Sequence, residues 1–320
     1  MTRERASKAN DRHPHVLCVG AAVLDTLFRV RKMPTGQGKV LPYDMLQIAE
    51  GMASSAAYAV VRLGGKASLW GAVGDDETGR RIIADLSLAG IDMSGMHIVQ
   101  GARSAISTIL VDDDGERLIV PFYDPELHRS IKLISTTEIA IFDAVLVDVR
   151  WPELALKALE TAQSLGKPAI LDGDVAADGV IERLGPAASH IVFSHPAAVK
   201  LAATEDCAAA IGVLKQRFPL AFISVTAGEN GTYWYDDVND CVMHMTVRPT
   251  KTVDTLGAGD IFHGAFAFAV AQQLQIEEAI RISSAAAALK CQVFGGRTGA
   301  PDSDQLAACL AQWTPQISRV

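Results

Sequence analysis

The feature that most constrains the fold is a regular alternation of short apolar runs with longer helical stretches. Six uninterrupted, β-rich runs have the character of strands buried on both faces, and they are VLCVGAAV (16–23), ASLWGAVG (67–74), AVLVDV (144–149), PAILDGD (168–174), HIVFS (190–194) and AFISVTAG (221–228). Helix-like stretches separate them or follow them at 52–63, 77–89, 152–165, 208–217, 258–274, 276–291 and 302–313. The alternation predicts a three-layer α/β fold, in which a mainly parallel sheet is flanked by helices on both sides.

Two segments depart from this alternation and predict a small second sheet. Residues 35–48 and 104–122 resemble strands of alternating polarity, and DDDGE (112–116) inside the second is a hairpin signal. In α/β proteins such an appendage often covers a ligand site at the carboxyl ends of the strands. We therefore expect a β lid on one domain that spans residues 16–320, and exposed lid strands that pair in a homodimer.

Charge and cysteine usage exclude several classes of function. The chain of 320 residues has a formal net charge of −8 and no basic run, which argues against a nucleic-acid partner. Its five cysteines are an odd number without CxxC spacing, so we expect no disulfide framework, no zinc site and a cytoplasmic location. No apolar run reaches the ~18 residues of a membrane span, and residues 1–15 are expected to form a disordered polar tail.

The stretch DTLGAGD (254–260) carries the strongest functional signal. Small residues at 257–259 let the backbone approach a ligand closely, and the apolar run after them predicts a buried helix with Asp260 in its first turn. The spacing fits neither a P-loop nor a dinucleotide fingerprint. Backbone N–H groups here would stabilise an anion while Asp260 accepts a proton from a hydroxyl, which favours phosphoryl transfer to an alcohol. The alternative is a glycine-rich turn before a core helix that Asp260 merely caps.

The same stretch resembles the second signature, DTxGAGD, of the ribokinase/PfkB carbohydrate kinase family, and the resemblance extends over residues 16–301. It implies a ribokinase-like fold and an ATP-dependent sugar kinase that uses Mg²⁺. By this likeness Asp260 is the catalytic base, and Gly257, Ala258 and Gly259 form the anion hole. Asp254 would help to hold a monovalent cation such as K⁺ beside the hole, as in some relatives.

The resemblance also implies binding residues elsewhere in the chain. Asp25 stands where the family has an aspartate that hydrogen-bonds sugar hydroxyls, although it could equally be an ordinary turn residue. The loop VTAGENG (225–231) stands where the family binds nucleotide phosphate, here through Thr226, Gly228 and Gly231. Its alternative interpretation is a hairpin turn. Residues 287–301 look like the family's segment along the adenine pocket.

Departures from the family pattern bear on the substrate. Gly51 matches the first signature, but Ser55 replaces an asparagine that contacts the sugar, so the sugar pocket is altered. Sulfofructose kinases look closest among family members, and by that likeness Lys39 and Arg150 would bind an anionic sulfonate. Both side chains could equally be solvated surface residues, and Pro121 replaces an asparagine of those kinases.

A further departure bears on the metal. The family's NxxE motif is missing, so Mg²⁺ would be held by phosphates, waters and other acids; Asp172 and Asp174 in LDGD are candidates, unless they only end a strand. His263, close to Asp260, is predicted to be a packed core histidine.

The predicted reaction is transfer of the γ-phosphoryl group of ATP to a primary hydroxyl of a ketohexose-type sugar, with 6-deoxy-6-sulfofructose as the leading example. Fructose, ribose, 2-keto-3-deoxygluconate and fructose 6-phosphate are alternatives. Another is a sugar- or nucleoside-sensing protein that kept the fold and lost turnover.

Overall fold

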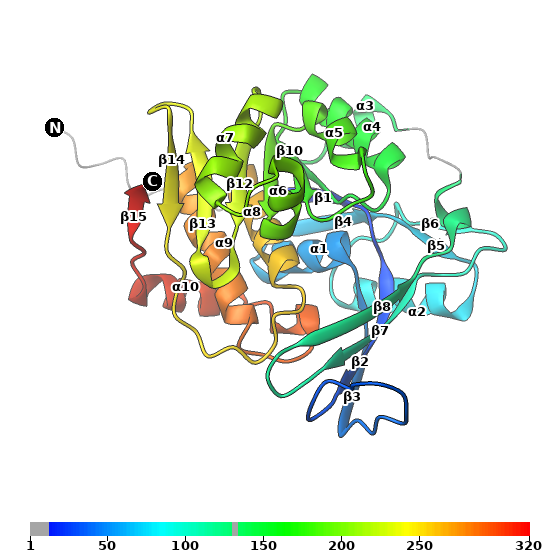
Figure 1. The fold of residues 1–320 in the computed structure, drawn as a ribbon. Helices are drawn as coiled ribbons and strands as arrows, with labels where there is room; N and C mark the ends of the chain where they lie inside the picture. The colour runs from blue at the N-terminus through cyan, green and yellow to red at the C-terminus, as the bar shows by residue number, and fades with distance from the viewer. Residues whose placement is uncertain (1–12, 130–133) are drawn as a thin grey trace.

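The computed structural model describes residues 13–129 and 134–320, and within them a nine-stranded sheet forms the centre of the molecule (Figure 1). Its spatial order is β15-β14-β13-β12-β11-β10-β9-β1-β4. The strands from β4 to β12 in this order pair in parallel, and β13, β14 and β15 extend the sheet in antiparallel pairs. Their bounds are β1 (His15–Val19), β4 (Lys66–Trp70), β9 (Ala144–Val147), β10 (Ala169–Gly173), β11 (His190–Ser194), β12 (Phe222–Thr226), β13 (Thr232–Asp236), β14 (Cys241–Met245) and β15 (Ile317–Arg319). The prediction of a mainly parallel sheet is confirmed.

Helices cover both faces of this sheet. The α-helices are α1 (Met52–Arg62), α2 (Glu77–Leu88), α3 (Thr136–Ile139), α4 (Pro152–Ser164), α5 (Val180–Leu184), α6 (His195–Ala202), α7 (Cys207–Arg217), α8 (Ala258–Ala271), α9 (Ile276–Lys290) and α10 (Ser303–Gln312). Short 3₁₀ turns are η1 (Pro125–His128), η2 (Gly185–Ala187), η3 (Gly228–Asn230) and η4 (Gly296–Gly299). Across the described residues every helix is too short or too polar to span a bilayer.

The uninterrupted apolar strands are explained by two hydrophobic cores, one on each face of the sheet. In β1, Val16 and Cys18 pack with residues of α1, α8 and α9, whereas Leu17 and Val19 pack with residues of α4 and α7. Successive side chains of a strand point to opposite faces, so a strand covered on both sides is apolar at every position. This arrangement confirms the three layers.

A separate four-stranded sheet stands off the main body below α1 and beside α2 in Figure 1. It has the order β3-β2-β7-β8, with bounds β2 (Val23–Arg29), β3 (Asp44–Glu50), β7 (Ile106–Val111) and β8 (Arg117–Phe122). Leu27, Ile48, Ile109 and Val111 form its own small core. β7 and β8 are antiparallel around the turn at 112–116, where the Asp112 N–H donates to the Glu116 carbonyl at 3.1 Å, as the hairpin signal predicts. A two-stranded sheet pairs β5 (Ala72–Gly74) with β6 (His97–Val99).

The lid differs from its prediction because one strand was missed. The run 16–23 is not one strand: β1 ends at Val19, and the chain enters the lid as β2. The break occurs at Gly20, which has φ +149° and where a Cβ would lie 2.1 Å from the Asp148 carboxyl group. Conversely, residues 35–43 form no strand, and β3 begins at Asp44. Gly71 likewise divides the run 67–74 into β4 and β5, which belong to different sheets.

The amino-terminal boundary also differs slightly from the prediction. Most of the expected tail, residues 1–12, lies outside the described residues. His15, the last residue of that expected tail, opens β1. The Pro14 carbonyl accepts a hydrogen bond of 2.8 Å from the Lys66 N–H, so the sheet pairing begins before residue 16.

Candidate active site

A cavity of about 160 Å³ lies between the lid and the carboxyl ends of the parallel strands. The lid, the starts of α1 and α8, and the segments after β9 and β10 line it together: Val23, Asp25, Glu50, Gly51, Met52, Ser107, Ile109, Ile119, Pro121, Tyr123, Arg150, Asp174, Leu256, Gly257 and Asp260. A larger cavity of about 220 Å³ lies beside α5 and α6. It holds none of the motif residues, and its cations are already paired, as with Lys200 and Asp178 at 2.7 Å. We therefore place the site in the smaller cavity.

The start of α8 supplies the chemistry of this cavity. Gly257 precedes the helix with φ +73°, a left-handed conformation that favours glycine. The Ala258 N–H donates to the Thr255 carbonyl at 3.2 Å. For the N–H groups of Gly259 and Asp260 the described residues supply no internal acceptor, as expected in the first turn of a helix. These two donors, rather than the N–H of Ala258, are free to bind an anion.

The Asp260 carboxyl group has a proton affinity suited to a base. Its side chain is only partly exposed and faces the cavity. Burial raises its pKa to about 7, and the nearby carboxylates of Asp174 and Asp148 add to this effect, while Arg150 opposes it. A carboxylate with a pKa near 7 can both take up and release a proton near neutral pH, as general base catalysis requires.

Arg150 and Asp174 form a charged pair beside Asp260. They follow the neighbouring strands β9 and β10, and the Arg150 Nη2 lies 3.6 Å from the Asp174 Oδ2. Asp148 fixes the backbone here, since its carboxylate accepts N–H bonds from Arg150 at 2.8 Å and from Ala21 at 2.7 Å. The Ser194 hydroxyl donates to Asp174 at 2.8 Å. The pair therefore lies on a rigid edge of the sheet.

Asp25 reaches the cavity from the lid and not from the central sheet. The register of the lid sheet places Asp25 of β2 beside Ser107 of β7, and Ser107 beside Pro121 of β8, so the three residues form a row across the sheet. The Ser107 hydroxyl donates to the Asp25 Oδ1 at 2.6 Å. Burial raises the Asp25 pKa to about 6, although the bond from Ser107 opposes the rise. Asp25 is therefore a polar group that the lid presents to the cavity.

Glu50 is a site residue that the sequence did not predict. It is buried, its Oε1 accepts the Arg297 N–H at 2.7 Å, and its Oε2 accepts the Ser55 hydroxyl at 2.5 Å. Burial raises its pKa to about 8, so it is largely protonated at neutral pH. Gly51 beside it has φ +119°, and a Cβ there would lie 2.4 Å from the Ala21 carbonyl oxygen. The available sequence signal was a carboxylate directly before Gly51, the residue that matches the first signature.

Ser55 does not have the position that was expected of a sugar-binding residue. It is fully buried within α1 and does not line the cavity. Its hydroxyl is committed to Glu50, which lies at the cavity wall. Ser55 thus influences the cavity only through Glu50.

Asp254 is surrounded in a way that leaves no place for an added cation. Its carboxylate accepts the N–H groups of Leu256 at 2.8 Å and of Gly295 at 3.0 Å, and the Lys290 Nζ lies 3.2 Å from its Oδ2. Asp254 and Lys290 are both fully buried. The expected K⁺ position beside Asp254 does not fit this structure, because the lysine ammonium already lies there.

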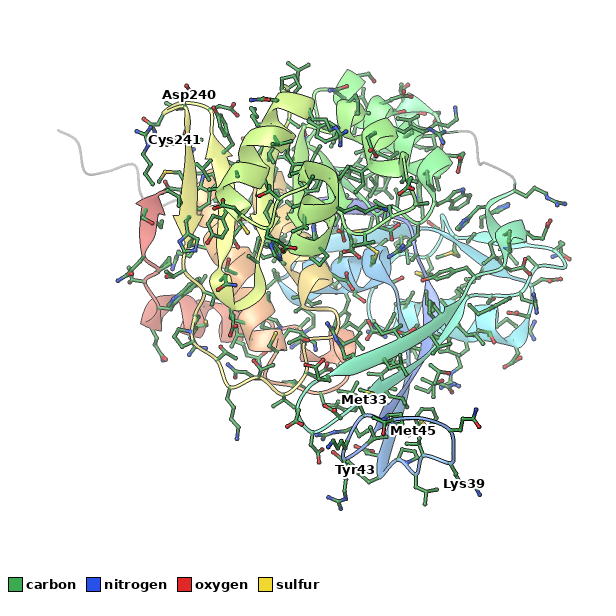
Figure 2. All side chains as sticks on the ribbon, in the orientation of Figure 1. Met33, Lys39, Tyr43, Met45, Asp240 and Cys241 are labelled. Carbon is green, nitrogen blue, oxygen red and sulfur yellow. The ribbon has the colours of Figure 1, made fainter. Side chains whose placement is uncertain are left out.

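Several other predicted residues are not brought into the cavity. Lys39 is exposed on the loop between β2 and β3, at the outer end of the lid (Figure 2). Asp172 is buried in β10, its Oδ1 lies 3.3 Å from the His263 Nε2, and burial raises its pKa well above the ordinary value. His263 is buried, with its two ring nitrogens 2.7 Å and 3.0 Å from the carbonyl oxygens of Gly259 and Val192, so the prediction of a core histidine is confirmed.

The predicted nucleotide-binding residues lie farther along the same edge of the sheet. Thr226 ends β12, and its hydroxyl donates to the Phe193 carbonyl at 3.2 Å. Gly228 opens the turn η3 with φ +55°, and Gly231 follows the turn with φ +85°. A Cβ on Gly231 would lie 2.1 Å from the Met245 carbonyl oxygen, so this glycine is required by the packing of β14. The turn into β13 is also the hairpin that the alternative interpretation described.

Of the two predicted Mg²⁺ ligands, only one lies where it could hold the metal ion. Among the described residues no group of three histidines, cysteines or acids is arranged to hold a metal ion. Asp172 does not fit Mg²⁺, since it is buried away from the cavity and burial raises its pKa well above the ordinary carboxyl value. Asp174 fits, because it lies at the cavity and one carboxylate with waters and substrate phosphates is the usual environment of Mg²⁺.

Comparisons with known proteins identify the family of this chain. The family model described as pfkB family carbohydrate kinase matches residues 13–303. The ATP-dependent ribose-1-phosphate kinase of Halopiger xanaduensis is 28% identical, over 93% of this chain and 98% of that protein, and the ribokinase of Bacillus subtilis is 26% identical, over 93% and 99%. A crystal structure from Agrobacterium tumefaciens, described provisionally as a ribokinase, is 61% identical with a TM-score of 0.93 and covers 94% of this chain and 99% of its own.

Proposed function

The chain belongs to the pfkB family of carbohydrate kinases and is an ATP-dependent sugar kinase, and we propose that its acceptor is the primary hydroxyl of a neutral sugar such as fructose or ribose. The observation that carries this proposal is the position of Asp260. It lies at the start of α8, next to two free backbone donors, in a cavity whose opposite wall presents Asp25. A base, an anion site and a hydroxyl-binding group therefore converge on one small volume.

The proposed reaction uses the residues at the start of α8. Asp260 accepts the proton of the attacking hydroxyl, and the N–H groups of Gly259 and Asp260 stabilise the charge on the transferred phosphoryl group. Asp25 orients the sugar by accepting a hydroxyl hydrogen bond. The lid covers the cavity and excludes water, which limits hydrolysis of ATP.

Nucleotide binding in this proposal follows the edge of the central sheet. ATP would extend from the start of α8 toward the loop at Thr226 and Gly228, which lies on the same edge as Asp174. Mg²⁺, bound with ATP, supplies positive charge that offsets the developing charge on the phosphates. Asp174 would hold it, and Arg150 would add a second positive charge beside Asp260.

The charges at the cavity favour a neutral sugar over a sulfonate. The carboxyl groups of Asp25, Asp174 and Asp260 line it together with the largely protonated Glu50, and among the described residues Arg150 is its only lysine or arginine side chain, already close to Asp174. Lys39, which the sulfofructose hypothesis requires, is exposed at the outer end of the lid (Figure 2). An anionic sugar end would therefore meet several acids and a partly neutralised arginine, a costly arrangement in a confined site.

A coupled ADP-release assay with a sugar panel tests the proposal. The panel contains fructose, ribose, 2-keto-3-deoxygluconate, fructose 6-phosphate and 6-deoxy-6-sulfofructose, with Asp260→Asn as the matched inactive control. We expect the highest kcat/KM with fructose or ribose. A higher kcat/KM with sulfofructose would refute the neutral-sugar assignment, and binding of a sugar without ADP release above the control would favour a sensor.

We also propose that two lids pair in a homodimer. β8 is an edge strand, and its apolar residues Leu118, Ile119 and Val120 are 47%, 46% and 60% exposed. An exposed edge with this composition is suited to association with a second sheet. Light scattering should give twice the chain mass for the wild type and the monomer mass for Val120→Asp. A wild-type monomer at micromolar concentration would contradict the pairing.

A further inference from the structure

Lys290 is a fully buried lysine whose role the proposed function does not explain. It lies in the last turn of α9, and its side chain has no exposed surface. Its ammonium donates to the Asp254 carbonyl oxygen at 2.8 Å and lies 3.2 Å from the Asp254 Oδ2. Lysine is rarely buried completely because its charge loses hydration, so the complete burial of Lys290 needs a specific reason.

The partner of Lys290 holds together the two turns that shape the anion site. The Asp254 Oδ1 accepts the Leu256 N–H, directly before Gly257, and its Oδ2 accepts the N–H groups of Gly295 and Gly296. The second turn is close to the first, since a Cβ on Gly257 would lie 3.7 Å from the Gly296 carbonyl carbon. Asp254 therefore determines how the backbone at the start of α8 is presented to the cavity.

A carboxylate in this position requires a positive charge beside it. Asp254 has no exposed surface, and three backbone N–H groups supply hydrogen bonds but no net charge. The ammonium group of Lys290 supplies both the charge and a donor to the backbone carbonyl oxygen of the same residue. A bound monovalent cation would serve the same purpose by coordinating the same carboxylate and carbonyl oxygens.

We propose that the Lys290 ammonium is a built-in monovalent cation, which positions the Asp254 turn and makes this kinase independent of K⁺. The proposal rests on the assigned site at the start of α8 and concerns how that site is kept in order. Lys290 is a positioning residue: it acts through Asp254 and the turn that leads to Gly257, and it does not line the cavity. The chain thus carries in its own sequence the charge that an ion would otherwise bring.

The first test is a salt titration of the wild-type enzyme. Turnover is measured in tetramethylammonium chloride, and this salt is then replaced by KCl at a constant ionic strength of about 100 mM, so that screening does not change. We expect kcat and kcat/KM to change by less than about twofold. Such a change is small compared with the effect of losing one charge–charge contact. An activation of tenfold or more by K⁺ would overturn the proposal whatever the variants show.

The second test removes the ammonium and offers an ion in its place. Lys290→Ala removes the side chain and opens space, whereas Lys290→Met removes the charge but keeps the space filled. We expect both variants to lose turnover at least about tenfold in tetramethylammonium chloride, and only Lys290→Ala to regain it in KCl or NH₄Cl. Lys200→Met, at a half-exposed lysine of α6, is the matched control and should respond to neither salt.

A measurement without turnover separates this inference from the proposed reaction. A cation that binds only the native state raises the melting temperature, so RbCl should stabilise Lys290→Ala and leave the wild type unchanged. That result would support the built-in cation even if no sugar of the panel were phosphorylated. A folded Lys290→Ala variant that is neither stabilised nor reactivated by any monovalent cation would refute it. If the variant does not fold, the wild-type titration alone decides.

Discussion

The pH dependence of turnover tests the assignment of Asp260 most directly. Because burial and neighbouring carboxylates raise its pKa to about 7, the base is mostly protonated at pH 6 and mostly ionised at pH 8. With one titrating group, about a tenth of the molecules carry the base form at pH 6 and about nine tenths at pH 8. We therefore expect kcat/KM for the sugar to rise about tenfold between these pH values, since at saturating MgATP this ratio reports the titration of the enzyme–MgATP form to which the sugar binds.

Two neighbouring side chains make the prediction directional. Arg150 lowers the Asp260 pKa, so Arg150→Met should move the acid limb of the profile to higher pH. Asp174 raises the Asp260 pKa, so Asp174→Asn should move the limb to lower pH. The two variants thus shift the profile in opposite directions. Both residues also contact the proposed ligands. We therefore compare the pH at the midpoint of the acid limb and not the maximal value of kcat/KM.

The assay measures ADP release from pH 5.5 to 8.5 with saturating MgATP and a neutral sugar, which does not itself titrate. Glu50→Gln and Asp25→Asn are the controls, because their pKa values of about 8 and about 6 fall in the same interval. The limb should remain in both and disappear in Asp260→Asn. A flat profile from pH 6 to 8, or shifts of Arg150→Met and Asp174→Asn in the same direction, would refute the reasoning.

Three further predictions concern activity and stability. Asp260→Asn should keep sugar binding by calorimetry but lose kcat about 10²–10⁴-fold. Because the pKa of Asp260 is raised in the folded state, its carboxylate lowers the stability of the wild type increasingly from about pH 4 to pH 7, so the variant should melt a few degrees higher than the wild type at pH 8 and at the same temperature at pH 4. Equal melting temperatures at pH 8 would indicate a solvated carboxylate and contradict the raised pKa. Glu50→Gln should unfold in urea like the wild type, whereas Glu50→Ala should lose about 1–3 kcal/mol by leaving the Arg297 N–H unpaired; equal losses would contradict a protonated Glu50. Gly264→Ala should destabilise the protein by more than about 1–3 kcal/mol because its Cβ would lie 2.2 Å from a carbonyl oxygen of α1, while Gly259→Ala, with open space, should not.

Much of the fold could be predicted from the sequence because its strands are covered on both faces. HIVFS at 190–194 coincides with β11, and the helix predicted at 52–63 is α1 with one residue fewer. The lid was predicted less well, since its strands are half-exposed and carry a weaker pattern. Gly20 ended a strand through a contact with Asp148, 128 positions away in the chain, which no local pattern contains.

The site was predicted in part. Residues placed by local motifs were identified, whereas residues placed by contacts with distant parts of the chain were not. Asp260, Asp25 and Arg150 line one cavity as local motifs and the family resemblance suggested. Lys39 does not, because the path of an exposed loop is decided by packing outside the motif. Ser55 was expected at the sugar, yet its hydroxyl donates to Glu50, which also accepts the N–H of Arg297, 247 positions away in the chain.

The sequence by itself determined the layered sheet and the helix that begins at the small-residue turn, since continuous apolar runs and glycine before a carboxylate are local signals of burial and close backbone approach. Only the tertiary structure decided how the buried acids are charged. The pKa of Asp260 depends on groups from other strands, and Asp254 meets the ammonium of Lys290 across 36 positions of the chain. Ionisation is set by distance and dielectric environment, and both exist only after the chain has folded.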